Sequence, residues 1–368
     1  MGNKLEIMNK RVVVAMSGGV DSSTTALILK EKGYRVFGLT MPTGSSAVQE
    51  ARRVADFLGI EHIVADLGDI FQSRVVEYFC RAYLAGQTPN PCISCNRYVK
   101  YGALFDYALA QGADFFATGH YARVHRDQEQ DRQLLLRAVN RKKDQSYVLY
   151  HLSQERLRHL LLPLGEVPTK DDVRRMAEAA GLPYLKKESQ EICFVPGDDY
   201  RAFLTSRYGQ EIRPGSFVDT EGKVLGQHQG LPFYTIGQRK GLGIALGSPA
   251  YVVSLDPSSN SVVLGQESDL MSAGLSAAET HFMMQEFART DAALEVQIRY
   301  NARAVPARLV GVEGDKARVV FDRPQRAVTP GQAAVFYHGD FVVGGGIITA
   351  GMPVNRGSAL RSPCPVRV

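Results

Sequence analysis

A loop of small and acidic residues, Ser17-Gly18-Gly19-Val20-Asp21-Ser22, follows the apolar run Val12–Val14. Two glycines let backbone N–H groups approach an anion closely, and the N-terminus of a following helix favours a phosphate there. The hydroxyls of Ser17 and Ser22 add donors, and the Asp21 carboxylate has the hard oxygen chemistry that Mg²⁺ requires. The loop therefore predicts a site for the pyrophosphate of ATP with its magnesium ion.

This loop differs from two common nucleotide motifs. The chain has no Gly-x-x-x-x-Gly-Lys-Ser/Thr segment, and the loop lacks the third glycine of the dinucleotide fingerprint. It resembles instead the signature Ser-Gly-Gly-x-Asp-Ser of the PP-loop ATP pyrophosphatases. An ordinary glycine-rich turn between a strand and a helix is the alternative explanation.

Cysteines form the second reactive group. Cys92 and Cys95 form a Cys-x-x-Cys pair at the expected start of a helix that runs to about Gly112, next to Arg97. A thiol in this setting should have a lowered pKa, so Cys95 is a candidate nucleophile. The pair alone is equally compatible with a redox motif, half a zinc site or two unconnected thiols, although no second pair completes a four-cysteine zinc site. Cys193 lies between apolar neighbours and, taken singly, is typical of a core residue.

Alternating apolar runs and helical patterns must position these groups. Such alternation predicts a mostly parallel sheet, whose ligands bind beyond the carboxyl ends of the strands. Gly18–Asp21, Met41 and Gly119 all fall at such ends, so we expect them to share a nucleotide pocket. The pattern predicts strands over 12–16, 34–41, 62–66 and 115–118, and helices over 22–32, 45–58, 69–84, 153–161 and 170–180.

The composition bounds the class of protein. A chain of 368 residues with 45% hydrophobic and 22% charged residues is typical of a soluble protein of two or three domains. The formal net charge of +5 permits an anionic partner. No run is long enough to span a membrane, and residues 1–11 lack a signal-peptide core, so we expect no membrane partner and a cytoplasmic location. Five cysteines are too few for a disulfide scaffold and are expected to be reduced.

The second half of the chain has a different pattern. From about residue 206 short β-prone runs punctuated by glycine replace the helical periodicity, including 217–218, 232–236, 251–255 and 261–264. We expect an α/β PP-loop domain over 1–205, a small β-rich domain over 206–275 and an antiparallel β-barrel over 276–368. Residues 355–368 are expected to form a loose tail in which Cys364 has no assigned role. Cys80 is expected to lie on an amphipathic helix and to serve only in packing.

Several ordered motifs together resemble the MnmA-type tRNA-specific 2-thiouridylases over nearly the whole chain. The segments that carry the resemblance are Ser17–Ser22, Asn90–Asn96, Thr118–Tyr121, Lys143–Tyr147, Ser189–Phe194 and Tyr234–Gly243. In that family ATP adenylates the oxygen of the wobble uridine of certain tRNAs, and sulfur then displaces AMP.

The resemblance implies a role for each matching position. Cys95 takes the place of the nucleophile, Cys193 that of the persulfide carrier, and a cysteine desulfurase or sulfur-relay protein supplies the sulfur. Residues implied to surround ATP are Ala15, Met16, Ser17, Gly18, Gly19, Val20, Asp21, Ser22, Met41 and Gly119. Asn90, Pro91 and Cys92 lie near the target base, and His120, Lys143, Asp144, Gln145, Arg299, Tyr300 and Gln332 touch tRNA.

One position departs from the commoner family pattern. Many members have aspartate where this chain has Cys92, which puts any role of that carboxylate in doubt here. Cys92, Cys95 and Cys193 would leave one position open on a [4Fe–4S] cluster, where an iron atom could hold a sulfide, as related tRNA thiolases do. The cluster is the alternative to the persulfide route.

Two other functions fit parts of the sequence. A PP-loop ligase that forms amides would share the nucleotide loop, but it would need a glutaminase half that is not recognisable here. A non-catalytic RNA-binding or redox protein would need only a degenerate loop, whereas Ser17, Gly18, Gly19, Asp21 and Ser22 are all intact.

Overall fold

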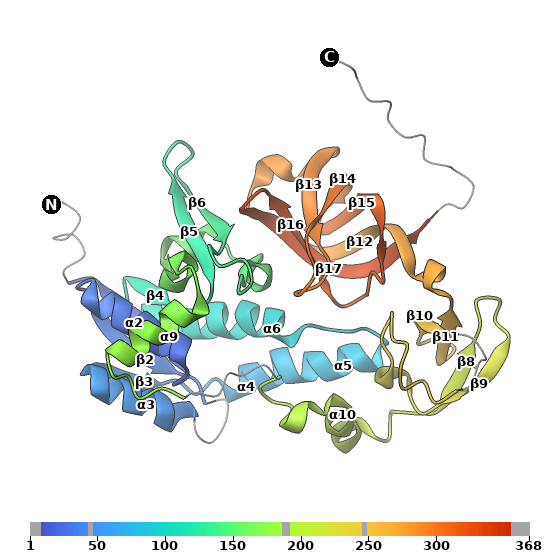
Figure 1. Ribbon diagram of the computed structural model, residues 1–368, viewed down its shortest axis with the longest axis horizontal. Helices are drawn as coiled ribbons and strands as arrows, with labels where there is room; N and C mark the ends of the chain where they lie inside the picture. The colour runs from blue at the N-terminus through green and yellow to red at the C-terminus, as the bar shows by residue number, and fades with distance from the viewer. Residues whose placement is uncertain (1–8, 43–46, 186–191, 245–248, 355–368) are drawn as a thin grey trace, which may run out of the picture.

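The computed structural model describes residues 9–42, 47–185, 192–244 and 249–354. The predictions for Ser189–Glu191, for the start of the 45–58 helix and for the tail with Cys364 fall outside these ranges. An α/β part lies at one end of the elongated molecule and a small β-rich part at the other, with a β-barrel beside the helices that connect them (Figure 1).

The α/β part is built on a five-stranded parallel sheet, as expected. Its order is β3-β2-β1-β4-β7, so the direction of strand addition reverses beside β1, where sheets of this kind bind ligands. Alternate residues of β1 face opposite layers. Val12 and Val14 pack with the helices α2 (Val20–Glu31) and α3 (Ala47–Leu58), and Val13 packs with η2 (Cys95–Leu104) and α7 (Phe105–Ala110). The strands are β1 (Arg11–Ala15), β2 (Arg35–Thr40), β3 (Glu61–Val64), β4 (Phe115–Ala117) and β7 (Leu160–Leu161).

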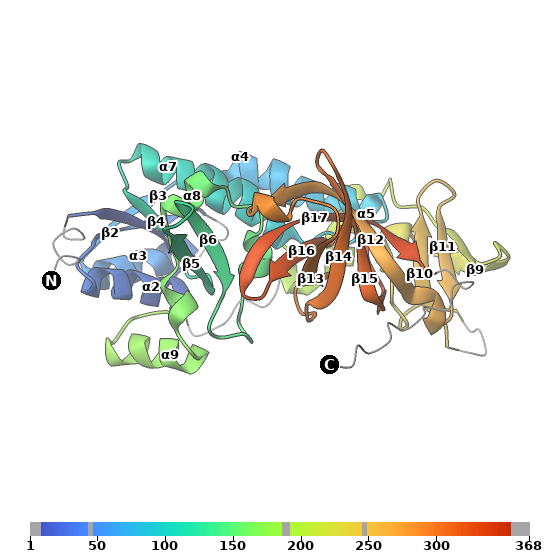
Figure 2. The same cartoon turned by 90° about the horizontal axis from the view of Figure 1, so that it is seen from above.

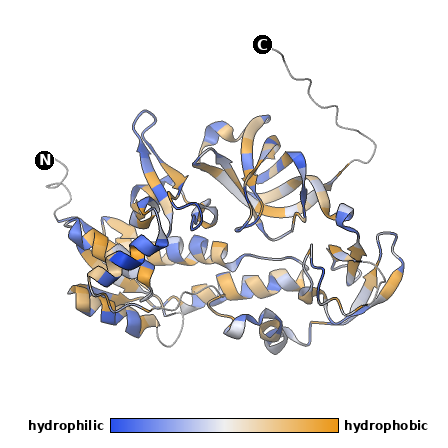
Figure 3. Cartoon of the chain, in the orientation of Figure 1, coloured by the Kyte–Doolittle hydropathy of each residue, from blue (hydrophilic) through white to orange (hydrophobic). Residues whose placement is uncertain are grey.

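Helices cover both faces of this sheet. One face carries α2 (Val20–Glu31), α3 (Ala47–Leu58) and, outside α2, α9 (Lys170–Ala179), whose residues are mostly hydrophilic (Figure 3). Two helical runs then cross the molecule towards the other parts (Figure 1). The first is α4 (Gly68–Phe71), η1 (Gln72–Glu77) and α5 (Tyr78–Leu84), and the second is α6 (Pro91–Ser94), η2 (Cys95–Leu104) and α7 (Phe105–Ala110).

The predicted helix over 153–161 is wrong at its end. Only α8 (Gln154–Arg158) is helical, and Leu160 pairs with Phe116 as part of strand β7. A short apolar run reads the same in a buried strand and in a buried helix, so periodicity cannot separate them. The sequence also gave no sign of the hairpin β5 (Ala122–Asp127) and β6 (Arg132–Arg137), which lies between the sheet and the barrel (Figure 2).

The small part is a four-stranded sheet of order β10-β11-β8-β9. The predicted strand over 232–236 is instead a 3-10 turn, η6 (Leu231–Phe233), because Pro232 has no N–H to give to a strand ladder. Helix α10 (Tyr200–Tyr208) connects this part to α5 through stacked Tyr83 and Tyr200 rings 4.9 Å apart. Its strands are β8 (Gly215–Val218), β9 (Val224–His228), β10 (Tyr251–Asp256) and β11 (Ser261–Gly265).

The C-terminal part is a closed antiparallel barrel, as expected. Its order is β12-β15-β14-β13-β16-β17, and β12 also pairs with β17, which closes it. Gly344 permits the closure, because a Cβ there would lie 2.2 Å from the His281 carbonyl oxygen. The strands are β12 (Met271–Phe282), β13 (Ala292–Gln297), β14 (Val305–Glu313), β15 (Lys316–Arg326), β16 (Ala333–His338) and β17 (Phe341–Pro353). Within the described ranges no helix has the length and apolarity needed to cross a bilayer.

Candidate active site

The loop after β1 has a conformation that only small residues permit. Gly18 has φ +76°, and a Cβ there would lie 2.4 Å from the Cβ of Glu50 on α3. The Ser17 N–H donates to Ser22 Oγ (3.1 Å), and the Ser23 hydroxyl donates to the Gly19 carbonyl (2.9 Å). The loop is therefore braced by its own hydroxyl groups at the start of α2.

A second loop, after β4, packs directly on the first. A Cβ on Gly119 would lie 2.9 Å from the backbone carbon of Asp21 and 2.9 Å from the Ser22 nitrogen. These are the loops that flank the reversal in strand order. The loop after β4 and the first residues of α2 are thus in direct contact beside the switch between β1 and β4.

Two cavities meet at this point. The first, of about 230 Å³, is lined by nine residues predicted around ATP or tRNA: Ala15, Met16, Ser17, Asp21, Ser22, Met41, Gly119, His120 and Gln145. The second, of about 720 Å³, continues from it to Asn90, Cys92, Lys143 and Tyr300. Their common wall consists of Ser17, Asp21, Ser22, Lys100, His120 and Gln145. The nucleotide loop and the Cys92 segment therefore face one continuous space.

Three thiols gather beside this space. Cys92 and Cys193 are exposed and Cys95 is partly buried, and none of them forms a disulfide. The pKa of Cys95 is raised to about 11, mainly by burial; the charge of Lys100 lowers it, and negative charge on Cys193 and Cys92 raises it. Lys100, Cys193 and Cys92 therefore all lie within electrostatic range of Cys95. The chain that leads towards Cys193 also touches the nucleotide loop, where the Leu185 N–H donates to the Gly18 carbonyl (3.0 Å).

The predicted lowering of the Cys95 pKa is therefore wrong. Arg97, expected to stabilise a thiolate, instead pairs with Glu279 at 2.8 Å. The Asn90 side chain also caps the helix start, where its Oδ1 accepts from the Cys92 N–H (3.0 Å), so that N–H is not free to stabilise a thiolate. Burial is then the dominant influence on the thiol.

We expect iodoacetamide to modify Cys95 more slowly than Cys92 at neutral pH, because thiolate is the reactive form. The rate at Cys95 should rise about tenfold per pH unit up to a midpoint near the raised pKa. Mass spectrometry of peptides from timed digests measures both cysteines in one sample, with glutathione as a free-solution reference. A Cys95 midpoint below that of glutathione would contradict the assignment.

The same thiols do not present a metal site in this arrangement. Among the residues that the structure describes, no group of three or more His, Cys, Asp or Glu side chains is placed to hold a metal ion. The cluster predicted as the alternative on Cys92, Cys95 and Cys193 thus gains no support from the geometry.

Two lysines on the cavity walls have no signal in the sequence. Lys170, the first residue of α9, donates from Nζ to both Asp21 carboxylate oxygens at 2.6 Å, and the Tyr121 hydroxyl donates to Oδ1 at 2.7 Å. Lys100, on η2, lines both cavities. Lys170 is 149 positions from Asp21 along the chain, so no local motif could have connected them.

Three family models match the chain in succession. They are described as a tRNA methyl transferase HUP domain (residues 10–197), a tRNA methyl transferase PRC-barrel domain (201–266) and an aminomethyltransferase beta-barrel domain (272–348). A tRNA-specific 2-thiouridylase MnmA of Desulforudis audaxviator is 57% identical over 92% of this chain and 98% of its own length. Proteins of the same name from Carboxydothermus hydrogenoformans (52%; 93% of this chain, 98% of theirs) and Moorella thermoacetica (51%; 91% and 98%) are similar over equal spans.

The chain belongs to the MnmA family of tRNA-specific 2-thiouridylases. The resemblance predicted from the motifs is thereby confirmed, and with it the assignment of the chain as an enzyme of the sulfurtransferase class. PP-loop membership implies that it binds ATP.

The residues that the resemblance places at tRNA divide into two groups in this MnmA-family chain. Lys143, Gln145 and Tyr300 line the second cavity. Asp144 instead organises its own loop by accepting from the Ala138 and Ser146 N–H groups. His120 does both: it lines the two cavities, and its Nδ1 lies 2.8 Å from Thr118 Oγ1 in its own loop. Burial lowers the pKa of His120 well below its usual value, so the ring that lines both cavities is neutral.

Arg299 and Gln332 are also engaged within the protein. Arg299 donates to Thr329 Oγ1 (3.0 Å), and Gln332 donates to the Thr88 carbonyl (2.7 Å), which ties the barrel to the segment before Cys92. Gly18, Gly19 and Val20 belong to the nucleotide loop, and Gly19 and Val20 also line the second cavity. Pro91 is buried at the start of α6.

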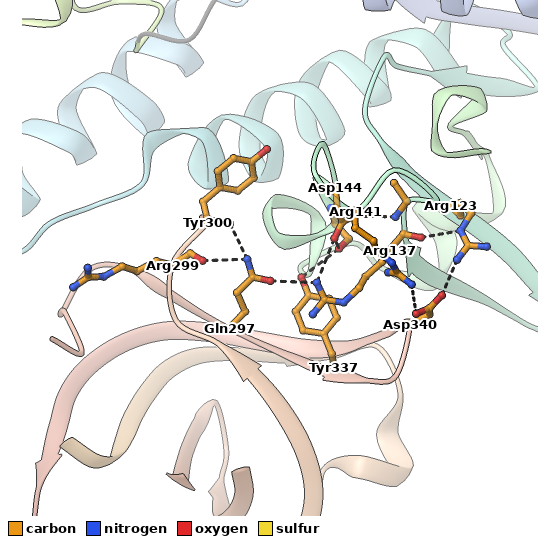
Figure 4. A network of polar contacts seen from close by, with 11 residues as sticks. Arg123, Arg137, Arg141, Asp144, Gln297, Arg299, Tyr300, Tyr337 and Asp340 are labelled. Carbon is orange, nitrogen blue, oxygen red and sulfur yellow. Dashed lines mark hydrogen bonds and ion pairs between the residues drawn. The ribbon is translucent and has the colours of Figure 1, made fainter. Parts of the chain in front are cut away.

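A polar network joins the hairpin to the barrel beside the second cavity (Figure 4). The Arg137 guanidinium lies 3.5 Å from the centroid of the Tyr337 ring and contacts Asp144 and Gln297 at 3.4 Å. Asp340 accepts from both Arg123 and Arg141. The network fixes the barrel edge that carries Tyr300 against the loop that carries Lys143.

Proposed function

We propose that this chain catalyses ATP-dependent 2-thiolation of the wobble uridine of tRNA. The observation that carries the proposal is the common wall of the two cavities, which puts the pyrophosphate loop and the Cys92 segment on one space. The family models carry the words methyl transferase, but methyl transfer needs neither a pyrophosphate loop nor neighbouring thiols. Both features support sulfur transfer.

The first step is attack by the uridine O2 on the α-phosphorus of ATP, which releases pyrophosphate and leaves an adenylated base. Gly18, Gly19 and the serine hydroxyls would hold the phosphates. Asp21 is the only carboxylate on either cavity wall within the described residues. One carboxylate suits Mg²⁺, which binds mainly through phosphates and water and would neutralise charge on the departing pyrophosphate.

Sulfur transfer follows on the activated base. A terminal persulfide sulfur on Cys193, supplied by a desulfurase or a relay protein, attacks C2 and AMP leaves with the former O2. The Cys95 thiol then gives up its proton and its sulfur attacks the inner sulfur of Cys193. The S–S bond to the transferred sulfur breaks, and 2-thiouridine is released with that proton on its ring nitrogen. The resulting Cys95–Cys193 disulfide takes two electrons from an external thiol before the next round.

The raised pKa of Cys95 suits this order of events. A thiol that stays protonated in the resting enzyme does not attack the persulfide before the base has been activated. Lys100 lowers the pKa of both Cys95 and Cys193. We therefore assign Lys100 the role of stabilising the thiolate in the reaction.

Incubation with ATP, Mg²⁺, unmodified tRNA, a persulfide donor and a thiol reductant tests the proposal. We expect 2-thiouridine at the wobble position by nucleoside mass spectrometry, with one AMP and one pyrophosphate formed per thiolation. Glutamine or ammonia should not replace the sulfur source. Amide formation, or tRNA binding with no ATP cleavage, would contradict the proposal in favour of a ligase or a binding protein.

The cluster route predicts activity under different conditions of preparation. If a [4Fe–4S] cluster carried the sulfide, only anaerobically reconstituted protein with bound iron would be active. Activity of iron-free protein with a persulfide donor supports the route through Cys193, and its absence would overturn that route.

A further inference from the structure

The Asp21–Lys170 ion pair lies on the wall of the candidate nucleotide site. Lys170 Nζ is 2.6 Å from both carboxylate oxygens, its side chain is 11% exposed, and that of Asp21 is 34% exposed. Both residues line the 720 Å³ cavity together with Ser17, Gly19 and Ser22. The pair is therefore placed where a pyrophosphate on the loop would reach it.

The charges on this cavity suit a polyanion. Its described wall carries four lysines and one acidic residue, Asp21. The loop itself contains no lysine, unlike a Walker loop, in which a lysine of the motif reaches the phosphates. A cation for the pyrophosphate must therefore come from elsewhere in the fold, and Lys170 is the one already held against the loop.

Its own helix fixes the position of Lys170. Thr169 caps α9 in a reciprocal capping box with Asp172, so the first turn, which contains Lys170, is rigidly set. The Nζ also lies 5.6 Å from the centroid of the Tyr121 ring, and the Tyr121 hydroxyl shares Asp21 Oδ1 with it. The ammonium group is thus held against the Asp21 end of the loop, beside the Tyr121 ring.

We propose that Lys170 exchanges partners when nucleotide binds: in the free enzyme it neutralises Asp21, and in the complex it donates to a pyrophosphate oxygen while Asp21 turns to the divalent cation. This inference rests on the proposed function, because it assigns Lys170 to the ATP of that reaction. A cation replaces a cation at Asp21, so the carboxylate is never left unpaired beside the phosphates. The exchange also makes Lys170 specific for the β and γ phosphates.

Binding of α,β-methylene ATP with Mg²⁺, measured by calorimetry without tRNA or sulfur donor, tests the exchange. Lys170→Ala and Lys170→Gln should weaken binding about ten- to hundredfold, as expected for loss of a charged hydrogen bond. Their affinity for AMP, which has no pyrophosphate, should stay within about twofold of the wild type. Lys170→Arg should keep most of the wild-type affinity for the ATP analogue, because it keeps the positive charge.

Arg174→Ala is the matched control, because Arg174 lies one turn further along α9 and pairs with Asp171. It should bind both nucleotides as the wild type does. Unchanged affinity of Lys170→Ala for the ATP analogue would overturn the proposal. An equal loss for AMP, with a lower melting temperature, would make the pair a structural tie and would also overturn it. Because the assay needs no thiolation, failure of the proposed function would appear separately, as wild-type protein that binds the analogue but forms no 2-thiouridine.

Discussion

Replacing Cys193 or Cys95 by serine is expected to abolish thiolation while leaving ATP binding intact. A serine oxygen at 193 cannot carry a transferable sulfur, and a serine at 95 cannot cleave the persulfide to form a disulfide. Each change should lower single-turnover thiolation by about a thousandfold or more, as for loss of a nucleophile. Neither side chain is on the wall of the nucleotide cavity, so the affinity for an ATP analogue should change by less than about twofold.

Cys92→Ser provides the matched control, on helix α6 directly before η2, which begins at Cys95. Cys92 is exposed and three positions from Cys95. In the persulfide route the variant should keep most of the activity, whereas a cluster held by three cysteines would lose it. Nucleoside mass spectrometry after one turnover, with calorimetry on the same preparations, separates the cases. Wild-type levels of 2-thiouridine from Cys193→Ser would contradict the proposed carrier.

The parallel sheet and its nucleotide loop could be predicted because their signals are local. Apolar β1, the Gly18-Gly19 turn and helix α2 follow each other within about twenty residues, and strand–helix alternation fixes the edge at which the loops meet. Strand β7 and the β5–β6 hairpin could not be predicted, because these segments form strands by pairing with distant ones. Strand β7 pairs with β4 at Phe116, and β6 pairs with the barrel edge at Phe341. Those contacts bridge distant parts of the chain.

In the candidate site too, residues in short local patterns could be predicted and those that depend on distant contacts could not. Residue types and motif order led to Asp21, Gly119, Cys92 and the sulfur pair, because each belongs to a short pattern. The state of Cys95 depended on burial and on Arg97 turning to Glu279 in the barrel, which no short segment encodes. Lys170 required the contact between α9 and α2, made by segments about 140 residues apart.

Gly119→Ala is expected to weaken ATP binding about a hundredfold. The added Cβ would lie 2.9 Å from two backbone atoms, the Asp21 carbon and the Ser22 nitrogen, which belong to the first turn of α2 and cannot rotate away. Overpacking against backbone costs about 1–3 kcal/mol, and here the strain falls on the turn that holds the phosphates. Thiolation should fall in parallel with nucleotide affinity.

Gly19→Ala distinguishes strain between the two loops from direct steric contact of an added Cβ with the phosphates. At Gly19 a Cβ would have only Ser17 Oγ near it, at 3.5 Å, and the backbone φ is ordinary, so the free protein should keep its melting temperature. Its loss of ATP affinity would then come from contact with the phosphates. Gly119→Ala should lower both melting temperature and affinity, because the two loops are pushed apart before any ligand arrives. Full ATP affinity in Gly119→Ala would mean that the close packing of these loops does not shape the nucleotide site.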